Sequence, residues 1–326
     1  MESSVFARWL RALVMVAAWV LPQAQAQAQD AWPTKPVRIV VPFPAGSPND
    51  LMARMLAPEL QRAFGQPFIV DNRPGAGGNV GMQEALRAND DHTLLVGVDT
   101  MITINPHVYQ KLAFRPAEDF VPVTQLASFN QVLVCNPEVR ARTLADLIAL
   151  ARKQPLSYGS GGIGTPGHMT MEMLLAAAQV DMVHTPYRGP GPALQDMVAR
   201  VLPCGFLTTG SVIPQLREGR LVALAVSGSR RLASLPDVPT VAESGYSGFD
   251  ATFSELVAAP RSMPAARVRR LNEVIGTALA KPELRAKLQQ MEYEPLANSP
   301  EDARRRLAAD ASRWGVVAKR VNLSLD

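Results

Sequence analysis

The sequence predicts an α/β protein with largely parallel sheets, and three observations support this fold class. Short apolar runs alternate with longer segments of helical spacing along the 326-residue chain. Three glycine-rich loops each follow an expected strand and precede an expected helix. No long linker, repeat or low-complexity tract divides the chain after its first segment. These features are typical of an α/β protein whose glycine-rich loops lie at the ends of its strands.

The expected elements follow one another in a regular order. The first clear helix begins at Leu51, where apolar residues recur at helical spacing until Gly65 provides a stop. Thr143 and Asp146 resemble a capping box for a helix to about Lys153. Ser299-Pro300 indicates another helix start, in a final region expected to be mainly helical. The expected strands are Val37–Val41, Phe68–Val70, Leu94–Val98, Val132–Cys135, Met182–His184 and Val222–Val226.

The chain is long enough for roughly two folding units, at about 150 residues each. Two extended stretches, Phe120–Asn136 and Phe249–Pro260, are candidates for connections between two lobes. A chain that crosses twice builds one lobe from both termini and the other from its middle.

Composition and charge exclude several classes of protein. With 47% hydrophobic and 19% charged residues, the chain is neither mostly disordered nor collagenous. The net charge of +4 is a small difference between 33 basic and 29 acidic residues, without a dense basic block, so nucleic acid is not an expected partner. Cys135 and Cys204 both fall in strand-like segments. They could form one disulfide in an oxidising compartment or remain two buried thiols, and spacing alone does not decide.

Residues 1–28 have the pattern of a secretory signal peptide. Arg8 and Arg11 lie at the start of an apolar stretch that is followed by small residues. The stretch is shorter than the roughly 20 apolar residues that span a membrane. We therefore expect a mature chain that begins near Gln27 or Gln29 and resides in the bacterial periplasm. No later stretch approaches the length of a membrane span.

The glycine-rich loops predict an anion site. They span residues 42–50, 72–81 and 158–168, and the first and third lead directly into helices. In open α/β sheets, ligands bind beyond the carboxyl ends of the strands, where such loops meet helix N-termini. Unpaired backbone N–H groups and the helix dipole attract an anion there. The alternative for any single loop is that its glycines merely allow a tight turn.

Enzymatic motifs are mostly missing. The second loop reads GxGxxxG instead of the dinucleotide pattern, and the sequence has no P-loop, GxSxG or HExxH motif and no zinc-type cysteine spacing. We therefore predict no cofactor, no metal and no catalytic residue. His168 lies at the mouth of the third loop, and we expect it to cap that loop through a ring nitrogen. For Asp50, at the first helix start, we expect pairing with Arg54 one turn later.

A series of collinear motifs resembles the Bug family, the periplasmic solute receptors of tripartite tricarboxylate transporters. The resemblance covers essentially the whole mature chain. The motifs are Pro42-Phe43-Pro44-Ala45-Gly46 with Asp50 and Ala53-Arg54, Asn72-Arg73-Pro74-Gly75-Ala76-Gly77-Gly78, Ile104-Asn105-Pro106, Asp119-Phe120-Val121-Pro122-Val123, Tyr158-Gly159-Ser160, Pro186-Tyr187-Arg188-Gly189, Leu224-Ala225-Val226-Ser227 and Leu235-Pro236-Asp237-Val238-Pro239-Thr240.

The resemblance implies a two-lobed periplasmic binding protein of type II, in which each lobe is a mixed, mostly parallel sheet flanked by helices. Lobe I would comprise residues 29–129 and 252–326, and lobe II residues 130–251. The family holds a ligand carboxylate mainly through backbone N–H groups, hydroxyls and waters of the first and third loops. Carried over, these ligand-binding positions are Phe43, Ala45, Gly46, Ser47, Asn49 and Asp50 on lobe I, and Ser160, Gly161, Gly164, Thr165 and His168 on lobe II.

The sequence departs from the family pattern at four places. Ser47 replaces a usual Gly and Asn49 a common Thr, Leu207 stands where an acid is frequent, and Phe253-Ser254 replaces a tryptophan. The last two departures predict a distal pocket unlike that of a typical member.

The functional expectation is a monomeric receptor that closes on a small carboxylate and delivers it to membrane permease subunits. One alternative is an exported α/β enzyme, such as a hydrolase that uses His168 with Asp50 or Ser160. A second alternative is a ligand-sensing receptor that contacts a signalling partner.

Overall fold

The computed structural model describes residues 32–320. The expected signal peptide over residues 1–28, with its cleavage near Gln27 or Gln29, lies outside the described residues. The described residues from Lys35 to Arg320 belong to one compact unit. Within the described part of the chain, no helix combines the length and the apolar character needed to cross a membrane.

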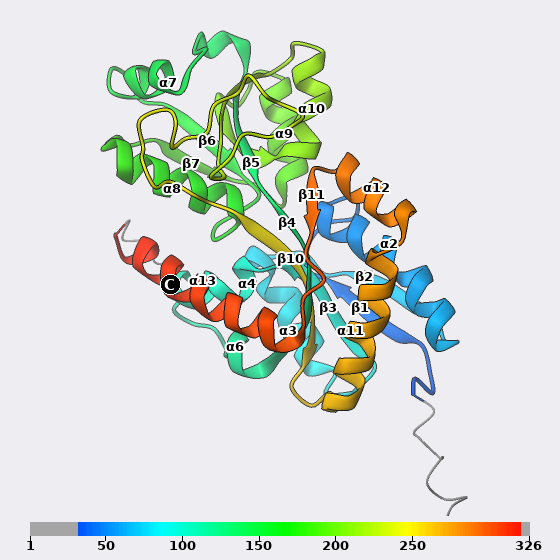
Figure 1. Cartoon of the computed structure of the whole chain (residues 1–326). Coiled ribbons are helices and arrows are strands. Elements are labelled where there is room, and N and C mark those ends of the chain that lie inside the picture. The colour runs from blue at the N-terminus through cyan, green and yellow to red at the C-terminus, as the bar shows by residue number, and fades with distance from the viewer. Residues whose placement is uncertain (1–31, 321–326) are drawn as a thin grey trace, which may run out of the picture. The chain divides into compact units, whose positions relative to one another are not determined.

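This unit contains two mixed sheets flanked by helices, which confirms the α/β, two-lobed fold class (Figure 1). We call the six-stranded sheet with its helices lobe I. Its strands lie in the order β11-β4-β10-β3-β1-β2. Their bounds are β1 Val37–Val41, β2 Phe68–Asn72, β3 Thr93–Val98, β4 Phe120–Phe129, β10 Phe253–Pro260 and β11 Tyr293–Pro295. The first four strands run in one direction, and β10 and β11 run in the other.

The helices of lobe I come from both ends of the chain. Figure 1 shows α2 and α11 side by side next to the sheet. The helices are α2 Pro48–Phe64, α3 Asn79–Arg87, α4 Thr100–Thr103, α5 Asn105–Val108, α6 Pro116–Asp119, α11 Ala265–Leu279, α12 Pro282–Gln290 and α13 Pro300–Arg320, with a short 3-10 turn at Ala76–Gly78.

Lobe II is the five-stranded sheet with its helices. Its strands lie in the order β7-β6-β8-β5-β9, and only β5 runs against the others. The strands are β5 Gln131–Cys135, β6 Ser157–Ser160, β7 Val183–Pro186, β8 Cys204–Thr208 and β9 Val222–Val226. The helices are α7 Leu144–Ala151, α8 Pro166–Ala178, α9 Pro190–Val198 and α10 Thr209–Arg217, with a 3-10 turn at Pro137–Val139.

The chain passes between the sheets at two places. It leaves β4 at Phe129 and enters β5 at Gln131, so Asn130 is the outward connection. It returns through Thr252 into β10, and the Thr252 hydroxyl donates to the Asn130 side-chain oxygen at 2.9 Å. The two connections are therefore hydrogen-bonded to each other and lie at one point of the molecule.

Several local predictions are confirmed. Gly65 ends α2 in a left-handed conformation, which glycine adopts without steric cost. Thr143 and Asp146 form a complete capping box on α7. Helix α2 begins at Pro48, earlier than expected, because Ser47 caps it and proline is suited to its first position. Cys135 and Cys204 lie opposite each other on β5 and β8 as buried free thiols, the second of the two alternatives.

Candidate functional site

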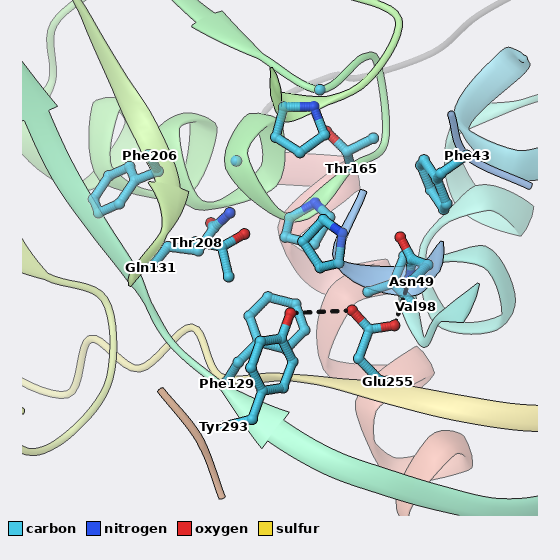
Figure 2. A pocket seen from close by; sticks show the side chains of 15 residues that line it. Phe43, Asn49, Val98, Phe129, Gln131, Thr165, Phe206, Thr208, Glu255 and Tyr293 are labelled. Atoms are coloured by element: carbon cyan, nitrogen blue, oxygen red, sulfur yellow. Dashed lines mark hydrogen bonds between the residues drawn. The ribbon is translucent and has the colours of Figure 1, made fainter. Parts of the chain in front are cut away.

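A small cavity lies between the two lobes, at the carboxyl ends of β1 and β3. Its volume is about 40 Å³. It is lined from lobe I by α2, β3, β10 and β11 and from lobe II by the residues around the start of α8 and by β8. The lining residues are Phe43, Pro48, Asn49, Val98, Phe129, Gln131, Gly161, Thr165, Pro166, Gly167, Pro190, Phe206, Thr208, Glu255 and Tyr293. Figure 2 shows Thr165 and Glu255 on opposite sides of this space.

The start of α8 presents free backbone donors to the cavity. Thr165 precedes the helix, but its hydroxyl donates to the Gly162 carbonyl at 2.7 Å and places no side-chain cap on the first turn. Pro166 has no N–H group, so Gly167 and His168 carry the first amides without an intrahelical acceptor. The helix has 13 residues, and its dipole favours negative charge at this end.

Close packing fixes the position of that helix start. A Cβ atom on Gly167 would lie 2.5 Å from the Phe206 carbonyl oxygen of β8. Only glycine allows the first turn of α8 to approach β8 so closely. Gly167 therefore fixes the position of its own amide, and the uncapped helix start leaves that amide without an intrahelical acceptor.

A chain of buried rings and hydroxyls supports the third loop. The Gly164 amide donates to His168 Nδ1 at 3.1 Å, which confirms the predicted capping role of this histidine. His168 stacks on His184 with ring centroids 4.0 Å apart, and His184 Nε2 lies 2.7 Å from the Ser160 hydroxyl. Burial lowers the pKa of His168 to about 3, with a further lowering by His184, and burial lowers the pKa of His184 to about 4. Both rings are therefore neutral at physiological pH, and His168 Nδ1 is free to accept the hydrogen bond from Gly164.

The first loop is held by Asp50. This carboxylate, 2% exposed, accepts hydrogen bonds from the Gly46 amide at 2.9 Å, from Arg54 at 2.9 Å and from Asn72 at 3.0 Å. Burial opposes ionisation of Asp50, but the bonds from Arg54, Gly46 and Asn72 outweigh it and lower the pKa. The expected Asp50–Arg54 pair is confirmed, and the carboxylate is committed to the loop.

Glu255 forms the lobe I side of the cavity. It is 1% exposed, and its carboxylate accepts from the Asn49 side-chain amide at 2.5 Å and from the Tyr293 hydroxyl at 3.2 Å. Figure 2 shows this carboxyl group pointing into the cavity between those two side chains. Burial raises the pKa of Glu255 to about 7, against the bonds from Tyr293 and Asn49.

The predicted site residues therefore fall into two groups. The cavity is lined by Phe43, Asn49, Gly161 and Thr165. The others lie in the same two loops but outside the lining: Ala45, Gly46, Ser47, Asp50, Ser160, Gly164 and His168. Among these, Ser160 is fully buried, and its hydroxyl donates to the Gly162 carbonyl at 3.0 Å.

Sequence reasoning missed the residues that β10, β11 and β8 bring to the cavity: Glu255, Tyr293 and Thr208, together with Gln131. A single acid within the apolar run of β10 was the one available signal for Glu255. The departure at Leu207 does not reach the cavity, because this side chain packs in the lobe II core while Phe206 faces the ligand space. Phe253 stacks on Trp314, with ring centroids 5.3 Å apart.

The lobes touch beside the cavity. The Tyr109 hydroxyl of lobe I donates to the Ile163 carbonyl of lobe II at 3.0 Å. Phe43 and Gly161 line both this inner cavity and a wider outer one of about 580 Å³, which extends along the second loop and past Arg188. Among residues 32–320, no group of three or more His, Cys, Asp or Glu could hold a metal ion.

The chain is similar to several known proteins. The family model described as "Tripartite tricarboxylate transporter family receptor" matches residues 52–323. Protein BugT of Bordetella pertussis is 32% identical over 302 residues, which cover 91% of this chain and 92% of BugT.

Two solved structures are also similar. The structure described as "R. palustris Rpa4515 with adipate" has a TM-score of 0.85 at 32% identity and covers 90% of this chain and 100% of that one. MatC from Rhodopseudomonas palustris with bound malate has a TM-score of 0.82 at 30% identity and covers 88% and 99% of the two chains.

Proposed function

The chain belongs to the Bug family of tripartite tricarboxylate transporter receptors, and we propose that it binds a small carboxylate between its lobes in the periplasm. The observation that carries this proposal is the start of α8. Its first amides have no side-chain cap, and Thr165, Pro166 and Gly167 line a cavity enclosed by both lobes. Charge-assisted hydrogen bonds from such amides contribute about 1.5–3 kcal/mol each. A carboxylate can therefore be held there without a cationic side chain.

Binding requires the lobes to separate and close again. The inner cavity of about 40 Å³ has room for only a few waters, whereas small-molecule sites usually exceed about 300 Å³. The two connections at Asn130 and Thr252 are the natural hinge, and Tyr109 and Ile163 meet when the lobes are together. Ligand exchange by hinge motion suits a receptor that hands its ligand to permease subunits, and we propose that it does so as a monomer.

The arrangement supports a receptor better than a hydrolase. His168 accepts from Gly164 and stacks on His184, while Asp50 is bound to Arg54, Gly46 and Asn72 on the other lobe. Ser160 is hydrogen-bonded to His184, but it is fully buried beneath the loop. A nucleophile needs access to its substrate, so this Ser–His contact serves the loop.

Titration calorimetry tests the proposal. The purified protein is titrated with succinate, malate and adipate, and with the uncharged diamides of the same shape. We expect at least one acid to bind with one-to-one stoichiometry and to be recovered unchanged. Its diamide should bind about tenfold or more weakly, because it loses the charge-assisted bonds. Binding that is equal for acid and diamide, or turnover of the bound compound, would contradict a carboxylate receptor.

Native mass spectrometry of protein purified from its own periplasm provides a second test that assumes no ligand. A co-purified small acid would support the proposal and give the mass of the natural ligand.

A further inference from the structure

The cavity contains an acid for which a carboxylate receptor has no evident need. Glu255 is the only Asp, Glu, Lys, Arg or His among the cavity-lining residues of the described chain. It lies on β10 in the middle of the six-stranded sheet, opposite Val98 on β3 and Ala127 on β4. The register with β4 shifts directly after Glu255. Such irregularities re-aim side chains next to functional sites.

The partners of Glu255 leave part of its hydrogen-bonding capacity unused. Asn49 donates to one carboxylate oxygen and Tyr293 to the other. Both partners are neutral, and an ionised carboxylate offers about four lone-pair sites. A carboxylate buried to this extent is usually matched by a cation. Here the remaining lone pairs face the ligand space.

A second buried acid, Asp99, lies near Glu255. Asp99, which follows β3, is 4% exposed and accepts from the amide and the hydroxyl of Ser254 at 2.8 and 2.9 Å. Burial raises the pKa of Asp99, and the charges of Asp310 and Glu255 raise it further. Asp99 and Asp310 do not line the cavity, whereas Glu255 does. On the lobe I side, Glu255 therefore lines the cavity and Asp99 lies behind the lining.

We propose that the ligand is zwitterionic, with a carboxylate bound at the start of α8 and a protonated amine that reaches Glu255. This inference rests on the proposed carboxylate-receptor function and adds the second group of the ligand. The amine supplies the missing cation and donates to the free lone pairs of Glu255. The two ligand groups then match the two sides of the cavity, positive at α8 and negative at β10.

A dicarboxylate fits this cavity less well. Its second carboxylate would face Glu255, and one of the two acids would have to take up a proton to avoid a buried like-charge pair. Two relatives were solved with the dicarboxylates adipate and malate. The cavity of this chain contains Glu255, and we therefore infer a different class of ligand for it.

The test compares ligands that have the same number of carbon atoms and differ at the end opposite the shared carboxylate. Hexanoate, 6-aminohexanoate and adipate form one series, and butanoate, 4-aminobutanoate and succinate form a shorter one. Each is titrated calorimetrically into the wild-type protein and into Glu255→Gln, which keeps the size of the side chain and removes its charge. A pH of about 8 keeps Glu255 ionised, because its pKa is about 7.

In at least one series, we expect the amino acid to bind the wild-type protein about tenfold or more tightly than the monocarboxylate and the dicarboxylate of that series. In Glu255→Gln this preference should fall to within a few-fold, while binding of the plain monocarboxylate persists and shows that the variant is folded. If the variant binds nothing, the wild-type series decides the inference alone.

Two results would overturn the inference, and they are distinguishable. If acids bind but the amino acid of neither series is preferred, the zwitterion is wrong and the carboxylate receptor stands. If no acid of either series, nor succinate, malate or adipate, binds at all, the proposed function itself fails and the inference fails with it.

Discussion

The neutral state of His168 makes a quantitative prediction about stability. This ring is 2% exposed and accepts from the Gly164 amide at 3.1 Å. Its pKa is about 3 in the folded protein, against an ordinary value of 6.5. The unfolded chain therefore binds more protons at this site between those two values. The stability contribution is complete above about pH 6.5 and is lost as the pH falls toward 3.

The size of the effect follows from the pKa difference. A pH of about 5 is about 1.5 units below the ordinary pKa of the histidine in the unfolded chain, and each unit corresponds to about 1.4 kcal/mol. When the pH falls from 7.5 to 5, the free energy of unfolding should therefore decrease by about 2 kcal/mol because of His168 alone. His184 stacks on His168 and acts in the same direction, and Glu172 and Tyr158 are the other titratable groups close to the pair.

The assay is urea unfolding of the wild type and of His168→Asn at both pH values. The Asn side-chain oxygen can replace Nδ1 as acceptor for Gly164 but does not titrate. The loss of stability between the two pH values should be about 2 kcal/mol smaller in His168→Asn than in the wild type. His107→Asn, which changes an exposed histidine of lobe I, is the matched control for the loss of one histidine. Equal losses in the wild type and His168→Asn would refute the account of the buried ring.

Three further predictions concern the helix start, the lobe contact and the thiols. Gly167→Ala should weaken carboxylate binding about tenfold or more, because the new Cβ would lie 2.5 Å from a carbonyl oxygen of β8. Gly276→Ala in α11 is the control, since a Cβ there would meet nothing within 4 Å. It should stabilise the protein by up to about 1 kcal/mol and leave the calorimetric affinity unchanged. Tyr109→Phe should weaken binding several-fold, since a neutral hydrogen bond contributes about 0.5–1.5 kcal/mol, and an unchanged dissociation constant would show that this contact does not assist closure. Cys135 and Cys204 should react with Ellman's reagent only after unfolding and then as two thiols per chain, whereas none in the unfolded chain would indicate a disulfide.

Local signals in the sequence predicted the parts of the site that depend on local chemistry. Glycine, proline and hydroxyl residues between apolar runs predicted the two loops, because turn and cap geometry is set by residues close in sequence. The capping role of His168 was predicted from its place at the mouth of the third loop, and the Gly164 amide is the group that it caps. The positions on these loops were carried over from a family resemblance, and the structure separates those that line the cavity from those that build the loops.

The far side of the cavity depends on pairing between distant segments. Glu255 meets Asn49 across 206 residues of sequence and Tyr293 across 38. Tyr293 reaches it only because the short strand β11 adds to the edge of β4. Likewise, β6 was missed because Ser157–Ser160 contains serine and glycine and has no apolar run, although it is central enough to pair with β7 and β8. Such register is decided by the packed sheet, and no local pattern encodes it.

A crystal structure of the protein with its tightest-binding carboxylate tests the central claim most directly. The account predicts a ligand carboxylate within about 2.7–3.1 Å of the Gly167 and His168 amide nitrogens, with both lobes in contact with the ligand. A ligand carboxylate that lies elsewhere, or that is held by a lysine or arginine side chain while the start of α8 remains bare, would contradict it.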